Sequence, residues 1–321
     1  MVKAVTSIAT GEGRPTPWLA RLRLLFDLRY LALVTSVATY ALIVLGGTVR
    51  ATDSGLACPD WPRCHGQLIP PLDTHVLIEY SHRLAAMTVG FLILGTAVSA
   101  WLWYRNNRLL RGGATLALLL LIAQVLVGGV TVNMELPDTV VALHLAIALS
   151  LLASLLFTTV GAFRWGSSRM SDGPARAARG LLALPLVAGV AALGLILTGS
   201  YVANSGAGLV YPDWPLFNGK LVSAGGWLAD LHYVHRLMAV VVGLLVLAVL
   251  VQAWRRGRSS LVKTAAGLAL ALYVAQVFVG ASNIWFELAT SVRILHLALA
   301  SALWAALVLA ASGAYFERRI A

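Results

Sequence analysis

Four of the seven histidines occupy matched positions in two similar halves of the chain: His82, His144, His235 and His296. Each lies within a long apolar segment, about 7 to 14 Å from one end of that segment at 1.5 Å per residue of helix. An imidazole is costly in an apolar environment, so we expect these side chains to face the interior of a helix bundle and to have partners there. Two histidines from facing helices are typical axial ligands of haem iron. The pattern predicts that His82 pairs with His144 and His235 with His296. The alternative is that each histidine only hydrogen-bonds a neighbouring helix.

A carboxylate accompanies only the first of these pairs. Glu79 precedes His82 by three residues, which places both side chains on nearly one helix face, and the second half has His232 at that position. A carboxylate beside an iron site can relay protons or stabilise developing positive charge. It can also be an inert solvated residue near the lipid headgroups. A Glu-x-x-His pair occurs in di-iron sites as well, but those sites need glutamates from other helices, and the apolar segments hold none.

Three arginines lie near the same ends of the apolar segments: Arg83, Arg236 and Arg293. A guanidinium group matches the geometry of a carboxylate, so these side chains could neutralise haem propionates. Alternatively, they extend to the lipid headgroups.

The elements that must position these side chains are transmembrane helices. The chain is 59% hydrophobic and 12% charged, with a mean hydropathy of +0.82, whereas a soluble domain is about 25% charged. A transmembrane helix needs roughly 20 apolar residues. Eight segments meet this requirement, at about 29–50, 76–104, 113–134, 139–164, 179–203, 228–254, 262–285 and 290–316. The sequence therefore predicts an all-α polytopic membrane protein.

The basic residues predict the orientation of the helices. Most of the 24 Lys and Arg fall in alternate short gaps and at both ends of the chain, which places both termini in the cytoplasm and the histidines toward the outer face. The net charge of +11 therefore reflects topology and does not indicate a nucleic-acid partner. Residues 1–28 have no continuous apolar region, so they are interpreted as a cytoplasmic tail rather than a signal peptide.

The sequence contains an internal duplication. Residues 55–62, GLACPDWP, return as GLVYPDWP at 208–215, and the YSHRL that contains His82 returns as the YVHRL that contains His235. Four helices in each repeat give both halves the same orientation, related by a pseudo-twofold axis along the membrane normal. The predicted organisation is a tail at 1–28, a four-helix repeat at 29–164, a linker at 165–178, a second repeat at 179–316 and a tail at 317–321.

The only two cysteines, Cys58 and Cys64, lie in the first outer loop. The second half carries Tyr211 and Phe217 at these positions. A non-cytoplasmic location permits a disulfide between them. Such a bond either staples a long loop or forms a redox-active pair beside the first site.

Together these residues resemble the haem A synthase family. The resemblance covers residues 30 to 316 and rests on the Glu79-x-x-His82-Arg83 start of the second helix, the matching His235-Arg236, the later His144 and His296, and the outer loop with Cys58 and Cys64. It implies a cell-membrane enzyme that oxidises the C8 methyl group of haem O to a formyl group through successive hydroxylations. The product, haem A, serves haem-copper oxidases. The implied partners are haem O synthase, oxidase assembly factors and membrane lipid, and a homo-oligomer is left open.

The resemblance also implies roles for individual residues. His82, His144 and Arg83 would bind haem O, and Glu79 would be the catalytic carboxylate. His235 and His296 would ligate the iron of a resident haem B in the second half. Some family members carry a cysteine pair in both halves, whereas this chain has one only in the first, which leaves a redox role for the second loop without support.

Two other classes of protein compete with this interpretation. A quinol-oxidising cytochrome with two haems would use the same four histidines, but it usually places its haems at two depths, and here all four share one side. A haem transporter or chaperone would need the histidines but not Glu79.

Overall fold

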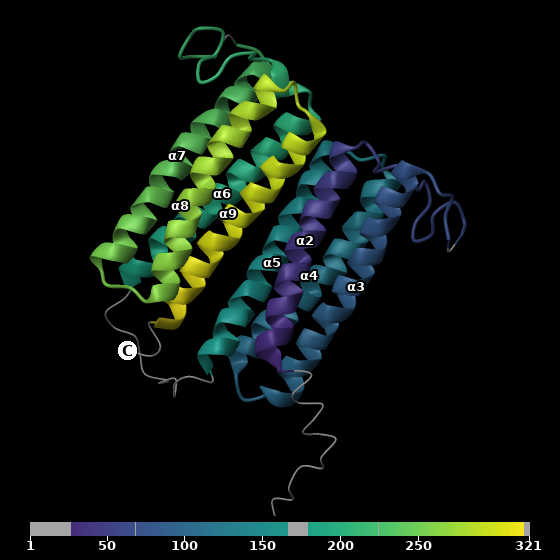
Figure 1. The fold of residues 1–321 in the computed structure, drawn as a ribbon. Coiled ribbons are helices and arrows are strands. Elements are labelled where there is room, and N and C mark those ends of the chain that lie inside the picture. Colours follow the sequence, from purple (N-terminus) through teal and green to yellow (C-terminus); the bar gives the residue numbers. More distant parts are fainter. Residues whose placement is uncertain (1–26, 68, 166–178, 224, 318–321) are drawn as a thin grey trace, which may run out of the picture.

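The structure is a computed structural model that describes residues 27–67, 69–165, 179–223 and 225–317 (Figure 1). Within these ranges the chain forms eight long α-helices, one short 3-10 helix and no strand. The α-helices are α2 (Leu28–Ala51), α3 (Thr74–Trp103), α4 (Arg108–Asn133), α5 (Asp138–Trp165), α6 (Arg179–Asn204), α7 (Trp227–Arg255), α8 (Ser260–Trp285) and α9 (Thr290–Glu317). The 3-10 helix η1 spans Ala207–Leu209. Nearly all of the predicted tails and linker lies outside the described residues.

All eight α-helices are long and apolar enough to cross a membrane, which confirms the predicted all-α membrane fold. Their bounds differ from the predicted ones by a few residues, most clearly at α4. This helix begins at Arg108 rather than near 113, because the Asn107 side chain accepts hydrogen bonds from the backbone N–H groups of Leu109 and Leu110. Hydropathy alone misses this first turn because it contains arginines.

Each half of the chain packs as a ring of four helices. In the first half α2 contacts α3 and α5, and α4 contacts the same two helices. In the second half α6 and α8 each contact both α7 and α9. The histidine-bearing helices of each half, α3 with α5 and α7 with α9, therefore lie diagonally across their bundle. The two bundles lie side by side in Figure 1.

The two bundles meet through α5 and α9, with further contacts of α5 with α6 and of α2 with α9. The largest buried apolar cluster lies here and includes Leu149 and Leu152 of α5 and Trp304 of α9. The indole N–H of Trp304 donates to the Leu149 carbonyl at 3.2 Å, and the Tyr40 hydroxyl donates to the Ala298 carbonyl at 3.0 Å. The axis relating the two halves stays a prediction.

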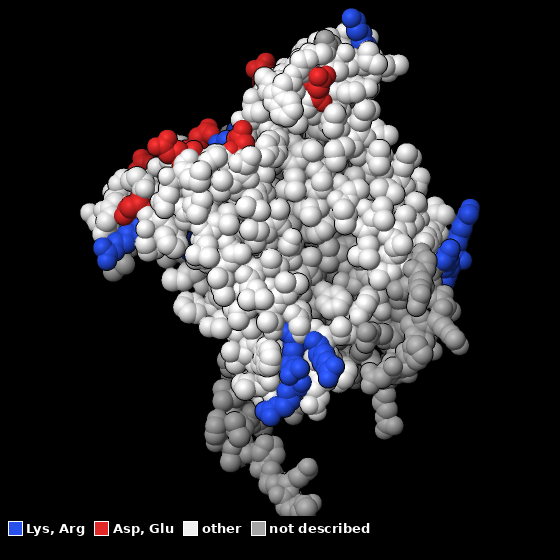
Figure 2. All heavy atoms as spheres, turned by 180° about the vertical axis from the view of Figure 1, so that it is seen from behind, with Lys and Arg blue, Asp and Glu red and all other residues white. Residues whose placement is uncertain are grey.

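The outer surface of the helices is apolar. Side chains such as Phe91, Leu126 and Val190 are more than 60% exposed, as expected for groups that face lipid. Figure 2 shows a broad uncharged surface between the two ends of the molecule. Every described Asp and Glu except Asp27 and Glu317 lies at the end that carries the long loops 52–73 and 205–226.

Candidate functional site

Each of the four matched histidines lies against a glycine on a neighbouring helix of its bundle, namely α2, α4, α6 or α8. The Cε1 atom of the ring is 3.1 Å from where a Cβ would stand on Gly46 for His82, and 3.2 Å from that place on Gly128 for His144. For His235 and His296 the corresponding distances, to Gly199 and Gly280, are 2.8 and 3.1 Å. A larger residue would displace the ring in every case. These glycines recur at matched positions of the repeat, and from the sequence such small residues were expected only to allow close approach of the helices.

The histidine rings carry buried nitrogen atoms without protein partners. The Nδ1 atoms of His82, His144 and His296 are buried and accept or donate no hydrogen bond within the described residues. His82 lies close enough to His144 for electrostatic interaction, and His235 is similarly close to His296. The members of each predicted pair therefore lie near each other within one bundle, and their role as iron ligands stays a prediction.

This arrangement fits haem. Two imidazoles on diagonal helices would hold the iron of a haem bound between them, and the porphyrin would supply the remaining iron ligands. The glycines leave room for the Cε1 edge of each ring to approach the neighbouring helix. No group of three His, Cys, Asp or Glu side chains able to hold a metal ion occurs in the part of the chain that the structure describes.

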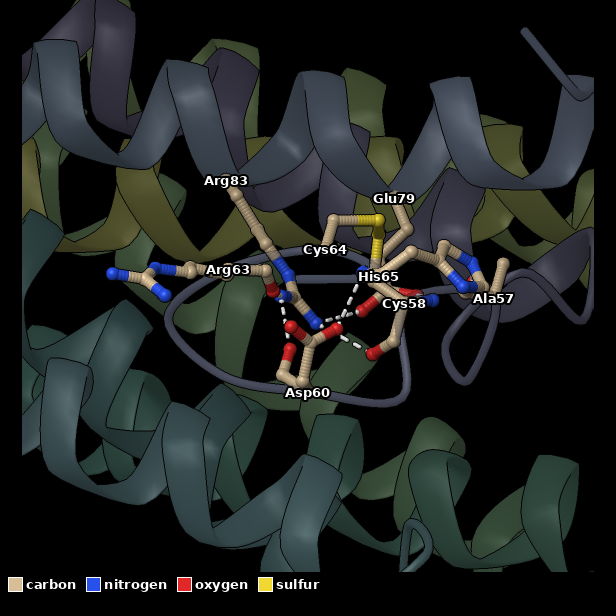
Figure 3. Close-up of polar contacts among 8 residues, drawn as sticks. All are labelled: Ala57, Cys58, Asp60, Arg63, Cys64, His65, Glu79 and Arg83. Atoms are coloured by element: carbon tan, nitrogen blue, oxygen red, sulfur yellow. Dashed lines mark hydrogen bonds and ion pairs between the residues drawn. A yellow bond between two sulfur atoms is a disulfide. The ribbon is translucent and has the colours of Figure 1, made fainter. Parts of the chain in front are cut away.

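Glu79 ties α3 to the first long loop (Figure 3). It is only 3% exposed, its Oε2 accepts the backbone N–H of Cys58 at 2.7 Å, and its Oε1 accepts from the Arg83 guanidinium at 2.5 Å. Arg83 also donates to the carbonyls of Asp60, Arg63 and Cys58 at 2.6 to 2.9 Å. Glu79 is therefore a buried, ion-paired carboxylate and not a solvated surface residue.

The two cysteines form a disulfide, as the sequence permitted. Both are fully buried, and they pack with Val76 at the start of α3. The bond lies directly beside the Glu79 contact, since Cys58 provides both a sulfur and the N–H that Glu79 accepts. The disulfide and the carboxylate thus belong to one connected network.

Residues 211–220 of the second loop repeat backbone features of residues 58–67 with different side chains, since the bridge between Phe217 and Lys220 matches that between Cys64 and Gln67. Arg236 donates to the carbonyls of Asp213 and Leu216, at the positions that correspond to Asp60 and Arg63. In place of Glu79, His232 accepts the Arg236 Nε–H at 3.1 Å, and its Nδ1 donates to the Ala207 carbonyl at 2.9 Å. The Nη2 atom of Arg236 is buried without a partner within the described residues. This nitrogen can therefore donate a hydrogen bond to the carboxylate of a bound molecule.

Aromatic rings replace the disulfide in this second loop. Tyr211 and Phe217 stack edge to face with ring centroids 5.0 Å apart, and the Arg236 guanidinium lies 4.9 Å from the Phe217 ring. The third predicted propionate ligand, Arg293, instead donates across the interface between the halves to the Ala51 carbonyl at 3.3 Å.

An aspartate shapes the tip of each loop. Asp60 accepts the N–H groups of His65 and Gly66, and Asp213 accepts those of Asn218 and Gly219, at 2.5 to 2.8 Å. These bonds, chiefly the one from the glycine in each loop, lower the pKa of both carboxyl groups below the ordinary 3.8. His65 and Asn218 have positive φ of 54° in these turns.

Comparison with known proteins agrees with the resemblance noted in the sequence. A family model described as cytochrome oxidase assembly protein matches residues 29–77 and 73–308. The Heme A synthase of Alkalihalophilus pseudofirmus is 30% identical over 283 residues, which cover 87% of this chain and 95% of that protein.

Further relatives carry the same name. The Heme A synthase of an Exiguobacterium species is 32% identical over 79% of this chain and 82% of its own length. That of Rhodospirillum centenum is 30% identical over 81% of this chain and 82% of its own length. The matches span both halves of the molecule, and the chain belongs to the family of cytochrome oxidase assembly proteins.

Proposed function

We propose that this protein is a haem A synthase, a multi-pass membrane enzyme that oxidises the C8 methyl group of haem O to a formyl group. The observation that carries this proposal is the asymmetry between two otherwise matched sites. Both halves bring a histidine pair across their bundle, but only the first adds a buried carboxylate, Glu79, held beside a disulfide. The names of the similar proteins point to the same reaction.

The first half, residues 29–164, is the proposed catalytic half. His82 and His144 would hold haem O between α3 and α5, and each ring would keep its orientation through its glycine neighbour, Gly46 or Gly128. Arg83 would act on the substrate mainly through Glu79 and the loop, since its guanidinium already donates to three carbonyls there.

Glu79 is the proposed proton acceptor. Oxidising a methyl group to an alcohol withdraws two electrons and releases protons. The electrons would leave through the haem iron to an external electron acceptor, while a nearby carboxylate can take up a released proton and stabilise positive charge near the reacting carbon. Each oxygen of Glu79 already accepts one hydrogen bond. A carboxylate oxygen has a second lone pair, so each can still accept a proton. The ion pair with Arg83 favours the ionised form of the group and fixes its orientation until that proton arrives.

The second half, residues 179–316, is the proposed haem B half. His235 and His296 would ligate the iron, and the unpartnered Nη2 of Arg236 would meet a propionate. Bound haem B supplies electron transfer to or from the first site. We also propose that both termini are cytoplasmic and that both haem sites lie toward the outer face, because the basic residues gather at the other end of the helices.

The test is to express the chain in membranes supplied with haem O and to identify the extracted porphyrins by mass and by pyridine haemochrome spectrum. We expect haem A from the unaltered protein. The double variant His82→Ala and His144→Ala should bind haem B but yield no haem A. The proposal is wrong if the unaltered protein binds haem O and never converts it, or if the double variant still makes haem A.

A further inference from the structure

One residue distinguishes His235 from the other three matched histidines. The Thr198 hydroxyl oxygen lies 3.3 Å from Nδ1 of His235 and 2.9 Å from the carbonyl oxygen of Leu195, one helical turn earlier in α6. A hydroxyl has one proton to donate, and it has two acceptors here, the Leu195 carbonyl and the Met238 sulfur at 3.8 Å. When the hydroxyl donates to the Leu195 carbonyl, its oxygen can accept a hydrogen bond from a protonated Nδ1 of the ring.

This contact, together with the nearby Leu195 carbonyl, which can only accept, favours the form of His235 that carries its proton on Nδ1. If Nδ1–H donates to Thr198, the lone pair of the neutral ring resides on Nε2. That is the form in which a histidine binds iron through Nε2. A hydrogen bond from the other ring nitrogen also makes the ligand more basic and fixes the plane of the ring.

The equivalent histidine of the first half has no such contact. The residue before Gly199 is Thr198, and the residue before the matching Gly46 is Leu45, which has no hydroxyl. The Nδ1 atoms of His82, His144 and His296 are buried without a hydrogen-bond partner among the described residues. Of the four rings, only that of His235 is held at both edges, by Gly199 at Cε1 and by Thr198 at Nδ1.

We propose that Thr198 is a positioning residue that makes the second haem site a permanent one, by fixing His235 in its iron-binding form. The lack of a partner at His82 then keeps the first site exchangeable, as a substrate site must be. This inference rests on the proposed function, because it takes His235 as a haem ligand. It adds a physical reason why two similar histidine pairs would treat their haems differently.

The principal test compares Thr198→Val with Thr198→Ser. Valine keeps the shape of threonine and removes the hydroxyl, whereas serine keeps the hydroxyl. Thr39→Val is a matched control, since Thr39 is a buried residue whose hydroxyl donates to its own helix, at the Thr35 carbonyl. Two properties of haem B in the purified protein would be measured: its midpoint potential, and its transfer to excess apomyoglobin.

We expect Thr198→Val to raise the midpoint potential, because a less basic ligand stabilises ferric iron less. It should also weaken haem B retention by about 10-fold or more, the effect typical of losing such a partner. Thr198→Ser should restore both properties, and Thr39→Val should change neither. The proposal is overturned if Thr198→Val keeps the potential and the retention of the unaltered protein, or if Thr39→Val shifts them equally.

A reverse variant tests the other half of the inference. Leu45→Thr places a hydroxyl one residue before Gly46, and it should slow the transfer of haem O from the first site to apomyoglobin. An unchanged rate would refute the link between this position and exchange. His235→Ala separates these results from a failure of the proposed function. If that variant keeps its full haem B spectrum, His235 is not a ligand, and the assignment of the site itself is wrong.

Discussion

Residues 58–67 and 211–220, in the two long loops, share several backbone features but are held together by different chemistry. In both, an arginine of the following helix donates to two loop carbonyls, and an aspartate closes the tip. The first loop also contains a disulfide and contacts the buried carboxylate of Glu79. The second contains an aromatic pair and contacts the ring of His232. Since the second loop keeps this shape without a disulfide, the loop backbone does not require one. The difference between the loops is therefore chemical, and it supports the proposal that the reaction takes place in the first half.

The largest expected effect comes from replacing Glu79, the buried acid that contacts the first loop and has no counterpart at the second. Glu79→Gln keeps the shape and loses the charge, so we expect haem A formation to fall by about 10²- to 10⁴-fold while haem B stays bound. The matched variant His232→Gln should leave most of the activity. Both are measured by the porphyrins extracted from membranes. Haem A at the unaltered level from Glu79→Gln would contradict the role of this carboxylate.

The next largest effect is expected from removing the disulfide of the first loop or the aromatic pair of the second. We expect neither Cys58 nor Cys64 to react with a thiol label unless a reductant is added, because both are buried and joined. Replacing both by serine should destabilise the first loop by about 2 kcal/mol, measured as faster proteolysis of residues 52–73. Phe217→Ala should loosen only the second loop. Labelling of both thiols in the oxidised protein would disprove the disulfide.

The glycines beside the histidines should give a smaller, graded effect. A methyl group on Gly199 would stand 2.8 Å from Cε1 of His235, so Gly199→Ala should cost about 1–3 kcal/mol and displace the ring. Gly46→Ala should cost less, because the corresponding distance to His82 is 3.1 Å. Gly90 is a control with no atom nearer than 3.9 Å. Thermal unfolding in detergent checks the order, and equal midpoints for all three variants would contradict it.

The smallest expected effect is a loss of amide protection in acid at the tips of both loops, where Asp60 and Asp213 lie. The pKa values of Asp60 and Asp213 are lowered in the folded protein, so each carboxylate stabilises its turn at pH values above the ordinary 3.8. This contribution is lost as the pH falls through the lowered pKa. We expect the amide protection of Gly66 and Gly219, corrected for intrinsic exchange, to decrease together in acid below about pH 4. Asp60→Asn should abolish the change in the first loop alone. A pH-independent protection of both amides would refute this account.

The sequence alone determined the features that depend on composition and on local repetition. Eight apolar segments of sufficient length have to become helices in a membrane, because every backbone polar group must be paired within the helix there. The duplication located His82, His144, His235 and His296, and it predicted their pairing. It also showed that Glu79 and the cysteines belong to one half only. These inferences need no knowledge of which side chains touch.

Only the tertiary structure decided which groups surround those residues. In the sequence, the four glycines are indistinguishable from small residues that allow helix packing, and only the structure shows that the histidine rings lie against them. The contact of Glu79 with the Cys58 N–H joins a helix to a loop 21 residues away, and the contact of Thr198 with His235 joins two helices. Such contacts depend on how helices are rotated about their axes and on how loops fold back over them. Hydropathy and spacing do not specify these rotations, because the lipid-facing and interior positions of these helices are almost equally apolar.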